Sequence, residues 1–386
     1  MVKIIYAFVI SVLLISCFAK KIETKSPIRV EEGVRIEKPN IPLSYKIVEG
    51  DPLKVREYTL KNGLKVFLSV NKNEPRIQTY VSVKTGGKND PAHATGLAHY
   101  LEHMLFKGTS RLGTIDYVKE KVELDKIKDL YEIYREETDS LKRVLIYAQI
   151  DSISQIASKY ACLNEFEQLH SAIGASGTNA YTNHENTVYK ANIPANQLEN
   201  WTKIESERFS EPVLRLFHTE LEAVYEEKNM SQDNHRRQQL YALNRALYKK
   251  HNYGLQTTIG TIEHLKNPSM LEIEKYFYKY YVPNNMAIIL SGDFDAEIAI
   301  RVIEKYFGKF KARPIDDYVF EKEDSIIKPI EIVINAPDAA SLLMAYRFEG
   351  GVSSKIHLVK MVDMILNNSK AGLIDLNINQ KQSNDF

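Results

Sequence analysis

The chain has 386 residues, of which 44% are hydrophobic and 26% are charged, with 51 basic and 50 acidic side chains. This length is enough to bury a sizeable core and to form roughly two domains. The net charge of +1 gives no reason to expect nucleic-acid binding.

The N-terminus has the pattern of an export signal. A basic start is followed by an apolar run from Ile4 to Ile15, which is too short for a comfortable membrane span. Residues 1–19 are therefore predicted to be a secretory signal peptide. The sequence Leu14-Ile15-Ser16-Cys17 resembles a bacterial lipobox, so we expect cleavage before Cys17 and lipidation of this cysteine. Plain cleavage near Ala19 is the alternative.

The next stretch, residues 20–50, is rich in Lys, Glu, Pro and Ile and is predicted to be an extended tether. A chain with this start is expected to be exported by a Gram-negative bacterium, either free in the periplasm or anchored to the membrane as a lipoprotein. Cys162 is the only cysteine besides Cys17, so lipidation or removal of Cys17 excludes an intrachain disulfide.

Strand and helix patterns then alternate irregularly. Residues 55–70 form two apolar runs around the turn sequence Lys61-Asn62-Gly63-Leu64, which predicts a hairpin. Further strands are predicted at 77–83 and 287–290, and helices at 96–106, 196–209, 216–248 and 296–307. Because the order lacks strict βαβ alternation, we expect an α+β fold.

The helix at 96–106 carries the sequence His99-Tyr100-Leu101-Glu102-His103. Residues i and i+4 of a helix share one face, so the two imidazoles can bind one metal ion, and Glu102 borders the same face. A carboxylate in this place can take a proton from a metal-bound water. An accidental surface pair of histidines is the alternative. The apolar neighbours favour a buried helix, where a metal removes the cost of unpaired polar groups.

Residues 116–170 contain two runs of apolar residues at helical spacing, separated at Asp139-Ser140. They predict two antiparallel helices that form an inserted hairpin with solvated charged faces.

A hydrolytic zinc site needs a third protein ligand, and residues 217–227 are the best source. Glu220 and Glu227 are seven residues apart and share one helical face, whereas Glu226 points elsewhere. One of the pair could bind the metal and the other could orient a ligand. The spacing does not choose between them.

A second domain is predicted to start near residue 325. Residues 330–335 and 342–346 have strand patterns, and a helix follows at about 355–367. The domain, 325–386, looks incomplete.

The run from Gly96 to Thr109 resembles the first motif of the pitrilysin/insulinase family of zinc peptidases, and residues 220–227 resemble its second motif. This resemblance implies that residues 51–310 form the peptidase domain, with a mixed, mainly antiparallel sheet packed with helices. It also implies that residues 325–386 begin a partial second domain of the same type. It implies that His99, His103 and Glu227 bind one Zn²⁺, that Glu102 is the catalytic acid–base and that Glu220 supports the site.

The segment Gly177 to Thr182 resembles the active-site edge strand of the family. The resemblance implies that a peptide substrate pairs with this strand around Asn179 and Ala180. The helical hairpin at 116–170 departs from the compact family pattern. In the family, two related halves enclose a chamber, so a second half or partner subunit is expected. The expected activity is metalloendopeptidase, and the alternative is a non-catalytic or incomplete subunit that needs a partner half.

Overall fold

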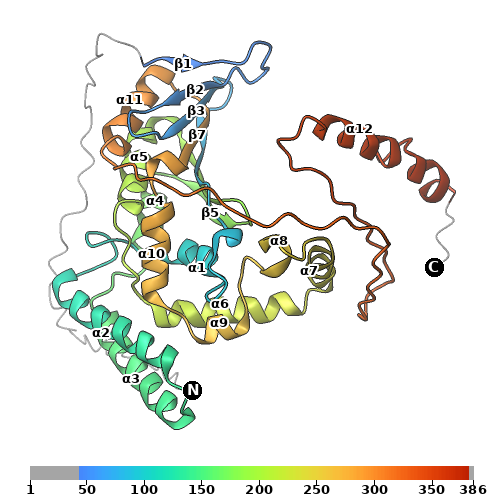
Figure 1. Cartoon of the computed structure of the whole chain (residues 1–386). Coiled ribbons are helices and arrows are strands. Elements are labelled where there is room, and N and C mark those ends of the chain that lie inside the picture. The colour runs from blue at the N-terminus through green and yellow to red at the C-terminus, as the bar shows by residue number, and fades with distance from the viewer. Residues whose placement is uncertain (1–42, 382–386) are drawn as a thin grey trace, which may run out of the picture. The chain divides into compact units, whose positions relative to one another are not determined.

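The computed structural model describes residues 43–381 (Figure 1). The predicted signal peptide, Cys17 and most of the predicted tether lie outside these residues. The predicted tether is wrong at its C-terminal end. Within it, Tyr45 and Lys46 form a short strand that pairs with Tyr58 and Glu57. Two residues are too few to give a strand periodicity in the sequence.

A single mixed sheet organises the first part of the chain. Its strands are β1 (Tyr45–Lys46), β2 (Arg56–Thr59), β3 (Lys65–Val70), β4 (Arg76–Val83), β5 (Ser176–Thr182), β6 (Thr187–Pro194) and β7 (Met286–Gly292). They lie in the order β1-β2-β3-β7-β4-β6-β5. The pair β3–β7 is parallel and the other pairs are antiparallel, so the sheet is mixed and mainly antiparallel, as expected.

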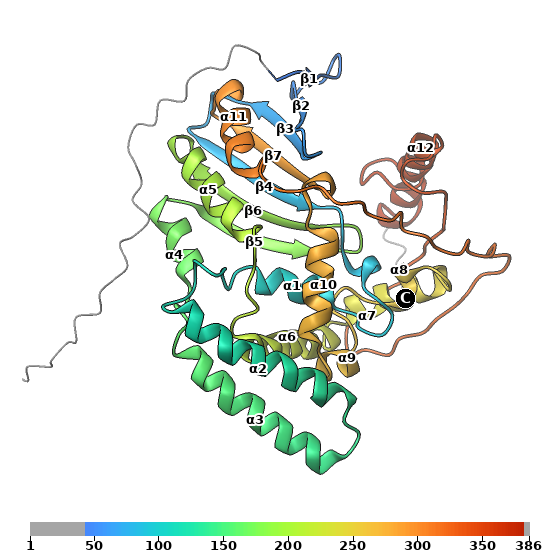
Figure 2. The same ribbon diagram turned by 60° about the vertical axis from the view of Figure 1, so that its left-hand side comes forward.

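Alternation of buried residues explains how the sheet packs. In β4, Ile77, Val81 and Val83 are fully buried on one face. The helices α5 (Leu198–Arg208) and α11 (Ala296–Phe307) pack on the sheet, as Figure 2 shows. The hairpin predicted at residues 55–70 is confirmed, because β2 and β3 pair antiparallel. Gly63, in the turn between them, has a positive φ of 87°.

The remaining helices of this part are α1 (Leu97–Met104), α2 (Tyr117–Glu136), α3 (Ser140–Ser158), α4 (Glu165–Ala172), α6 (Phe217–Gln232), α7 (His235–Leu247), α8 (Asn252–Leu255), α9 (Ile262–Lys266) and α10 (Met270–Tyr280). Short 3₁₀ turns lie at Gly87–Asn89, Ala195–Gln197 and Pro283–Asn285. The predicted single helix at 216–248 is wrong. It divides into α6 and α7, because the Asn234 side chain accepts a hydrogen bond from the Arg237 N–H and caps a new helix.

The predicted helical hairpin at 116–170 is present as α2 and α3, which lie side by side in both ribbon views (Figures 1 and 2). Asp139 caps α3 by accepting hydrogen bonds from Leu141 and Lys142. Leu124, Ile127 and Tyr131 of α2 are buried, so the hairpin is packed onto the domain core. The segment 116–170 also includes most of α4, which the sequence patterns did not predict.

The predicted strands at 330–335 and 342–346 are wrong, because neither segment is a strand in the structure. Their apolar side chains, among them Ile332 and Leu342, are exposed, and a strand without a hydrogen-bonded neighbour is not stable in water.

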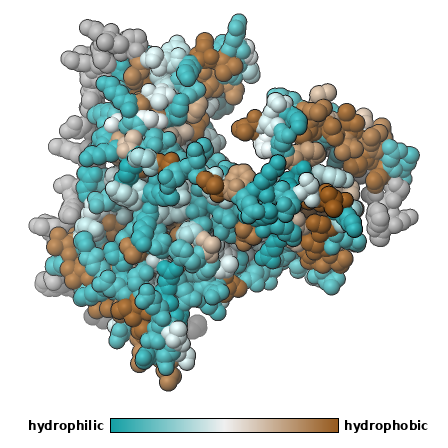
Figure 3. All heavy atoms as spheres, in the orientation of Figure 1, coloured by the Kyte–Doolittle hydropathy of each residue, from teal (hydrophilic) through white to brown (hydrophobic). Residues whose placement is uncertain are grey.

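The predicted helix near 355–367 is confirmed as α12 (Ile356–Leu366). Exposed apolar side chains gather over α12 (Figure 3). A π-helical turn follows at Asp375–Asn379.

In the part of the chain that the structure describes, no helix combines the length and apolar character that crossing a bilayer requires.

Candidate metal centre

The helix α1 is held in place by a carboxylate from the preceding loop. Gly96 precedes the helix with a φ of 92°, and a Cβ there would lie 2.8 Å from the Ile259 carbonyl oxygen. Asp90 is buried and accepts hydrogen bonds from the N–H groups of Gly96 at 2.7 Å and Ala98 at 3.0 Å. Asp90 therefore satisfies two of the free N–H groups at the start of the helix that carries both histidines.

The side chains of His99, His103 and Glu227 come together between α1 and α6. The Glu227 Oε2 lies 3.6 Å from His99 Nε2 and 3.6 Å from His103 Nε2. All three candidate ligand atoms lie within 4.8 Å of one another. Ligand atoms about 2.1 Å from a tetrahedral zinc are roughly 3.4 Å apart, so two imidazole nitrogens and one carboxylate at this spacing fit Zn²⁺.

The geometry also separates the roles of the two glutamates that the sequence spacing left open. Glu220 Oε1 lies 2.7 Å from Nδ1 of His103, the ring nitrogen that does not face Glu227. Its other oxygen pairs with Lys107 Nζ at 2.5 Å. Glu220 is therefore placed to fix the orientation of the His103 ring, whereas Glu227 faces both histidines.

The two histidines differ in their electrostatic surroundings. Burial, reinforced by the neighbouring His103, lowers the pKa of His99 to about 3, which keeps this imidazole neutral with a free lone pair. Burial also lowers the pKa of His103, but the hydrogen bond and charge of Glu220, together with the charges of Glu102 and Glu227, outweigh burial and raise this pKa overall. Metal binding requires the neutral imidazole, and an ion at Nε2 would leave the proton of His103 on Nδ1, facing Glu220.

Glu102 is 7% exposed and is not one of the three clustered side chains. Its Oε2 accepts a hydrogen bond of 2.6 Å from the hydroxyl of Thr182. Burial raises the pKa of the Glu102 carboxyl, and the hydrogen bond from Thr182 opposes this shift. A buried carboxylate with a raised pKa, one residue from a candidate ligand, is suited to proton transfer.

The strand β5 ends the sheet and lies beside α1. Its outer edge has no strand partner among residues 43–381, and β6 pairs with its inner edge. Asn179 is exposed and its Oδ1 accepts a hydrogen bond from the Ala180 N–H. Both residues therefore lie on a strand that is open to pairing on one side.

The contact of Thr182 with Glu102 was not predicted. The two residues are 80 positions apart, so no local spacing reports the contact. Strand alternation places Thr182 on the same face of β5 as Ala180, but it does not identify Glu102 as the partner of Thr182.

Replacement of Glu220 by Ala is expected to weaken zinc binding by roughly 10–100-fold, because His103 loses the acceptor that orients it. The zinc dissociation constant, measured by competition with a chromophoric chelator, checks this result. The matched control is Glu226→Ala, which removes an exposed carboxylate from the same helix. Equal affinities in the two variants would contradict the orienting role.

Comparison with known proteins identifies the family to which this chain belongs. The family sequence model described as "Insulinase (Peptidase family M16)" matches residues 65–125 and 153–260. A second model, "Peptidase M16 inactive domain", matches residues 269–377. The chain belongs to the insulinase (M16 peptidase) family. Residues 126–152, the distal part of the α2–α3 hairpin, fall outside both matches.

Two curated relatives are called zinc proteases. The chain is 25% identical over 259 residues to "Uncharacterized zinc protease YmxG" of Bacillus subtilis, covering 67% of this chain and 51% of that protein. It is 23% identical over 278 residues to "Probable zinc protease PqqL" of Haemophilus influenzae, covering 69% of this chain and 24% of that protein. The chain thus spans about half or less of the length of these relatives.

Solved structures support the same fold. A protease from Helicobacter pylori matches with a TM-score of 0.52 and 22% identity, over 70% of this chain and 53% of that one. The first half of the periplasmic protease PqqL from Escherichia coli matches with a TM-score of 0.53 and 19% identity, over 72% and 51%. The α+β, insulinase-like fold expected from the sequence is confirmed.

Proposed function

We propose that this chain is the metal-bearing part of a zinc-dependent endopeptidase that hydrolyses peptides or unfolded polypeptide segments. The observation that carries the proposal is the meeting of His99, His103 and Glu227 at zinc-ligand spacing, with Glu102 beside them. The names of the relatives, zinc proteases, support the same metal and reaction class.

In this proposal His99, His103 and Glu227 hold one Zn²⁺ and leave one coordination position open. When bound, zinc lowers the pKa of a coordinated water to about 7 and polarises the peptide carbonyl. Glu102 accepts the proton of the attacking water and passes it to the leaving nitrogen. Thr182 fixes the orientation of the Glu102 carboxylate through its hydroxyl.

The substrate binds in an extended conformation along the open edge of β5, near Asn179 and Ala180. Main-chain hydrogen bonds between the two strands supply affinity but read little sequence, so broad peptide specificity is expected.

A second homologous half, or a partner subunit, completes the active chamber. The chain spans 51% and 24% of the two zinc proteases, and the exposed apolar side chains of α12 are surface that a partner would cover. If the isolated chain binds zinc without turnover, it is an incomplete subunit that needs this half. Export through residues 1–19 and lipidation of Cys17 belong to the same proposal.

The experiment is cleavage of an unstructured fluorogenic peptide by the purified full chain, before and after chelation and again after zinc is restored. We expect cleavage that chelation abolishes and zinc restores. Cleavage that is unaffected by complete removal of the metal would contradict a metallopeptidase. If zinc binds without cleavage, the assay is repeated with an added homologous second half, and recovery of turnover identifies the chain as one subunit.

A further inference from the structure

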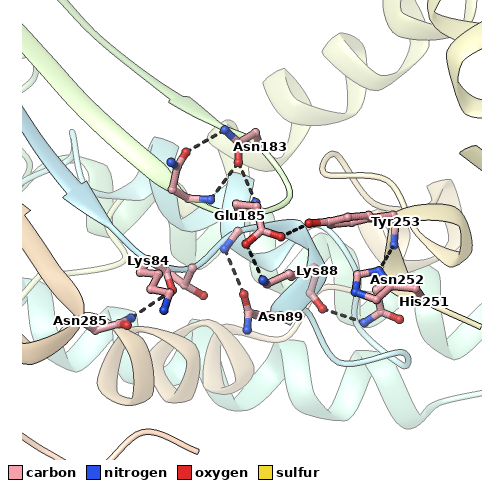
Figure 4. Close-up of polar contacts among 12 residues, drawn as sticks. Lys84, Lys88, Asn89, Asn183, Glu185, His251, Asn252, Tyr253 and Asn285 are labelled. Atoms are coloured by element: carbon pink, nitrogen blue, oxygen red, sulfur yellow. Dashed lines mark hydrogen bonds and ion pairs between the residues drawn. The ribbon is translucent and has the colours of Figure 1, made fainter. Parts of the chain in front are cut away.

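The tip of the β5–β6 hairpin is held by a group of polar side chains outside the metal centre (Figure 4). Glu185, in the tip, pairs through Oε2 with Lys88 Nζ at 2.5 Å. Its other oxygen accepts a hydrogen bond from the hydroxyl of Tyr253 on α8. The Lys88 side chain is 16% exposed and the Glu185 side chain is 45% exposed, so the pair is partly shielded from solvent on the lysine side.

The tip is internally rigid. The Asn183 side-chain oxygen accepts hydrogen bonds from the N–H groups of Glu185 at 2.7 Å and Asn186 at 2.8 Å, which closes a turn. The carbonyls of Asn183 and His184 accept from the N–H groups of Gly87 at 3.0 Å and Lys88 at 3.2 Å. The tip is therefore joined to residues 87–88 by both backbone and side chains.

Residues 87–88 belong to a longer segment, residues 86–90, which also accepts hydrogen bonds from side chains in and next to α8. The Asn252 side chain donates to the Lys88 carbonyl at 2.7 Å, and Gln256 donates to the carbonyls of Gly87 at 2.7 Å and Asp90 at 3.1 Å. Asp90 ends this segment and caps α1. One short segment therefore locates both the hairpin tip and the start of the metal-binding helix.

This arrangement bears on the proposed catalytic carboxylate. Thr182, the last residue of β5 before the tip, donates its hydroxyl to Glu102 on α1. Thr187, the first residue after the tip, donates its hydroxyl to the Thr85 carbonyl at 3.0 Å. The contact between Thr182 and Glu102 thus joins two elements whose relative position depends on residues 85–90.

We propose that Lys88, Glu185 and Tyr253 form a clamp in which Glu185 is a positioning residue: it holds the hairpin so that Thr182 reaches Glu102. The inference rests on the proposed function. None of the three clamp residues is a candidate metal ligand, so we expect the clamp to act on the orientation of Glu102 while the metal ligands stay in place.

A double-mutant cycle on kcat tests the proposal, using Glu185→Ala, Thr182→Val and the double variant in the full, zinc-loaded chain. We expect Glu185→Ala to lower kcat by about tenfold with zinc content unchanged, because a small displacement of a catalytic group is costly. In the Thr182→Val background, Glu185→Ala should change kcat by less than about twofold. Both substitutions act through the same hydrogen bond between Thr182 and Glu102, so its loss is counted only once. If the fold-loss of kcat in the double variant equals the product of the fold-losses in the two single variants, the proposal is overturned.

The matched control is Glu57→Ala, which removes the partner of Lys65 from an ion pair of 2.6 Å between β2 and β3. It should leave kcat unchanged. Tyr253→Phe removes only the hydrogen bond from the Tyr253 hydroxyl to Glu185, with less risk to folding, and the same double-mutant cycle is run with this variant. We expect Tyr253→Phe to lower kcat less than Glu185→Ala does, and to leave kcat unchanged in the Thr182→Val background.

Amide hydrogen exchange of the metal-free chain supplies a readout that does not require catalysis. Peptides covering residues 176–187 should exchange faster in Glu185→Ala than in the wild type, and no faster in Glu57→Ala. Unchanged exchange in Glu185→Ala would overturn the clamp. If the wild-type chain cleaves no peptide even after a homologous second half is added, the proposed function fails, while the exchange result still decides whether the clamp holds the hairpin.

Discussion

Replacement of Glu102 by Gln is expected to lower kcat/KM for peptide hydrolysis by roughly 10²–10⁴-fold while zinc remains bound. The amide has nearly the same shape and still accepts a hydrogen bond from Thr182, but it cannot take a proton from water. The candidate ligands His99, His103 and Glu227 are untouched. Steady-state kinetics and metal analysis on the same preparations check both parts of this expectation.

The control for this variant is Glu226→Gln, which neutralises an exposed carboxylate on α6. It should retain wild-type kinetics and zinc content. A Glu102→Gln enzyme that cleaves at the wild-type rate would refute the proton-transfer role. Loss of zinc in Glu102→Gln would instead show that this carboxylate takes part in metal binding.

Replacement of Arg215 by Ala is expected to destabilise the domain by about 3–5 kcal/mol, the usual cost of leaving one charge of a buried pair alone. Arg215 and Glu120 are both fully buried and form a two-point contact, with atoms 2.5 Å and 2.8 Å apart. Arg215 also donates to the carbonyls of Lys107, Thr109 and Leu112, in the loop after α1. Thermal and urea unfolding measure the loss, which corresponds to a fall in Tm of roughly 6–20 °C.

Arg111→Ala is the matched control for this substitution. Arg111 pairs with Glu207 but its side chain is 70% exposed, so its removal should cost less than about 1 kcal/mol. Similar losses of stability in Arg215→Ala and Arg111→Ala would show that burial does not make the Arg215–Glu120 pair more important for stability than an exposed pair.

The sequence predicted best those parts of the site that lie within one helix. His99, Glu102 and His103 occupy a single helix, where spacing alone places them on one face. Glu220 and Glu227 share a face of α6, and the choice between them depends on how α6 crosses α1, which is a tertiary contact. The Thr182–Glu102 contact and the clamp also join distant segments, so no local pattern could predict them.

The same reasoning explains the errors in the fold. Residues 330–335 alternate as a strand should, but strand formation requires a neighbouring strand and not only a local pattern. The break between α6 and α7 depends on one cap at Asn234 within an otherwise helical run. By contrast, α11 was predicted with its observed bounds, because its apolar residues repeat at helical spacing and Asp295 caps its start.

Zinc content of the purified chain is the most direct test of the central claim, measured for the wild type, His103→Ala and His93→Ala. His93 is an exposed histidine outside the candidate ligand set and serves as the control. The proposed site predicts about one zinc per chain in the wild type and in His93→Ala, and loss of that zinc in His103→Ala. A wild-type chain that takes up no zinc, or a His103→Ala variant that keeps it at full occupancy, would contradict the metal centre.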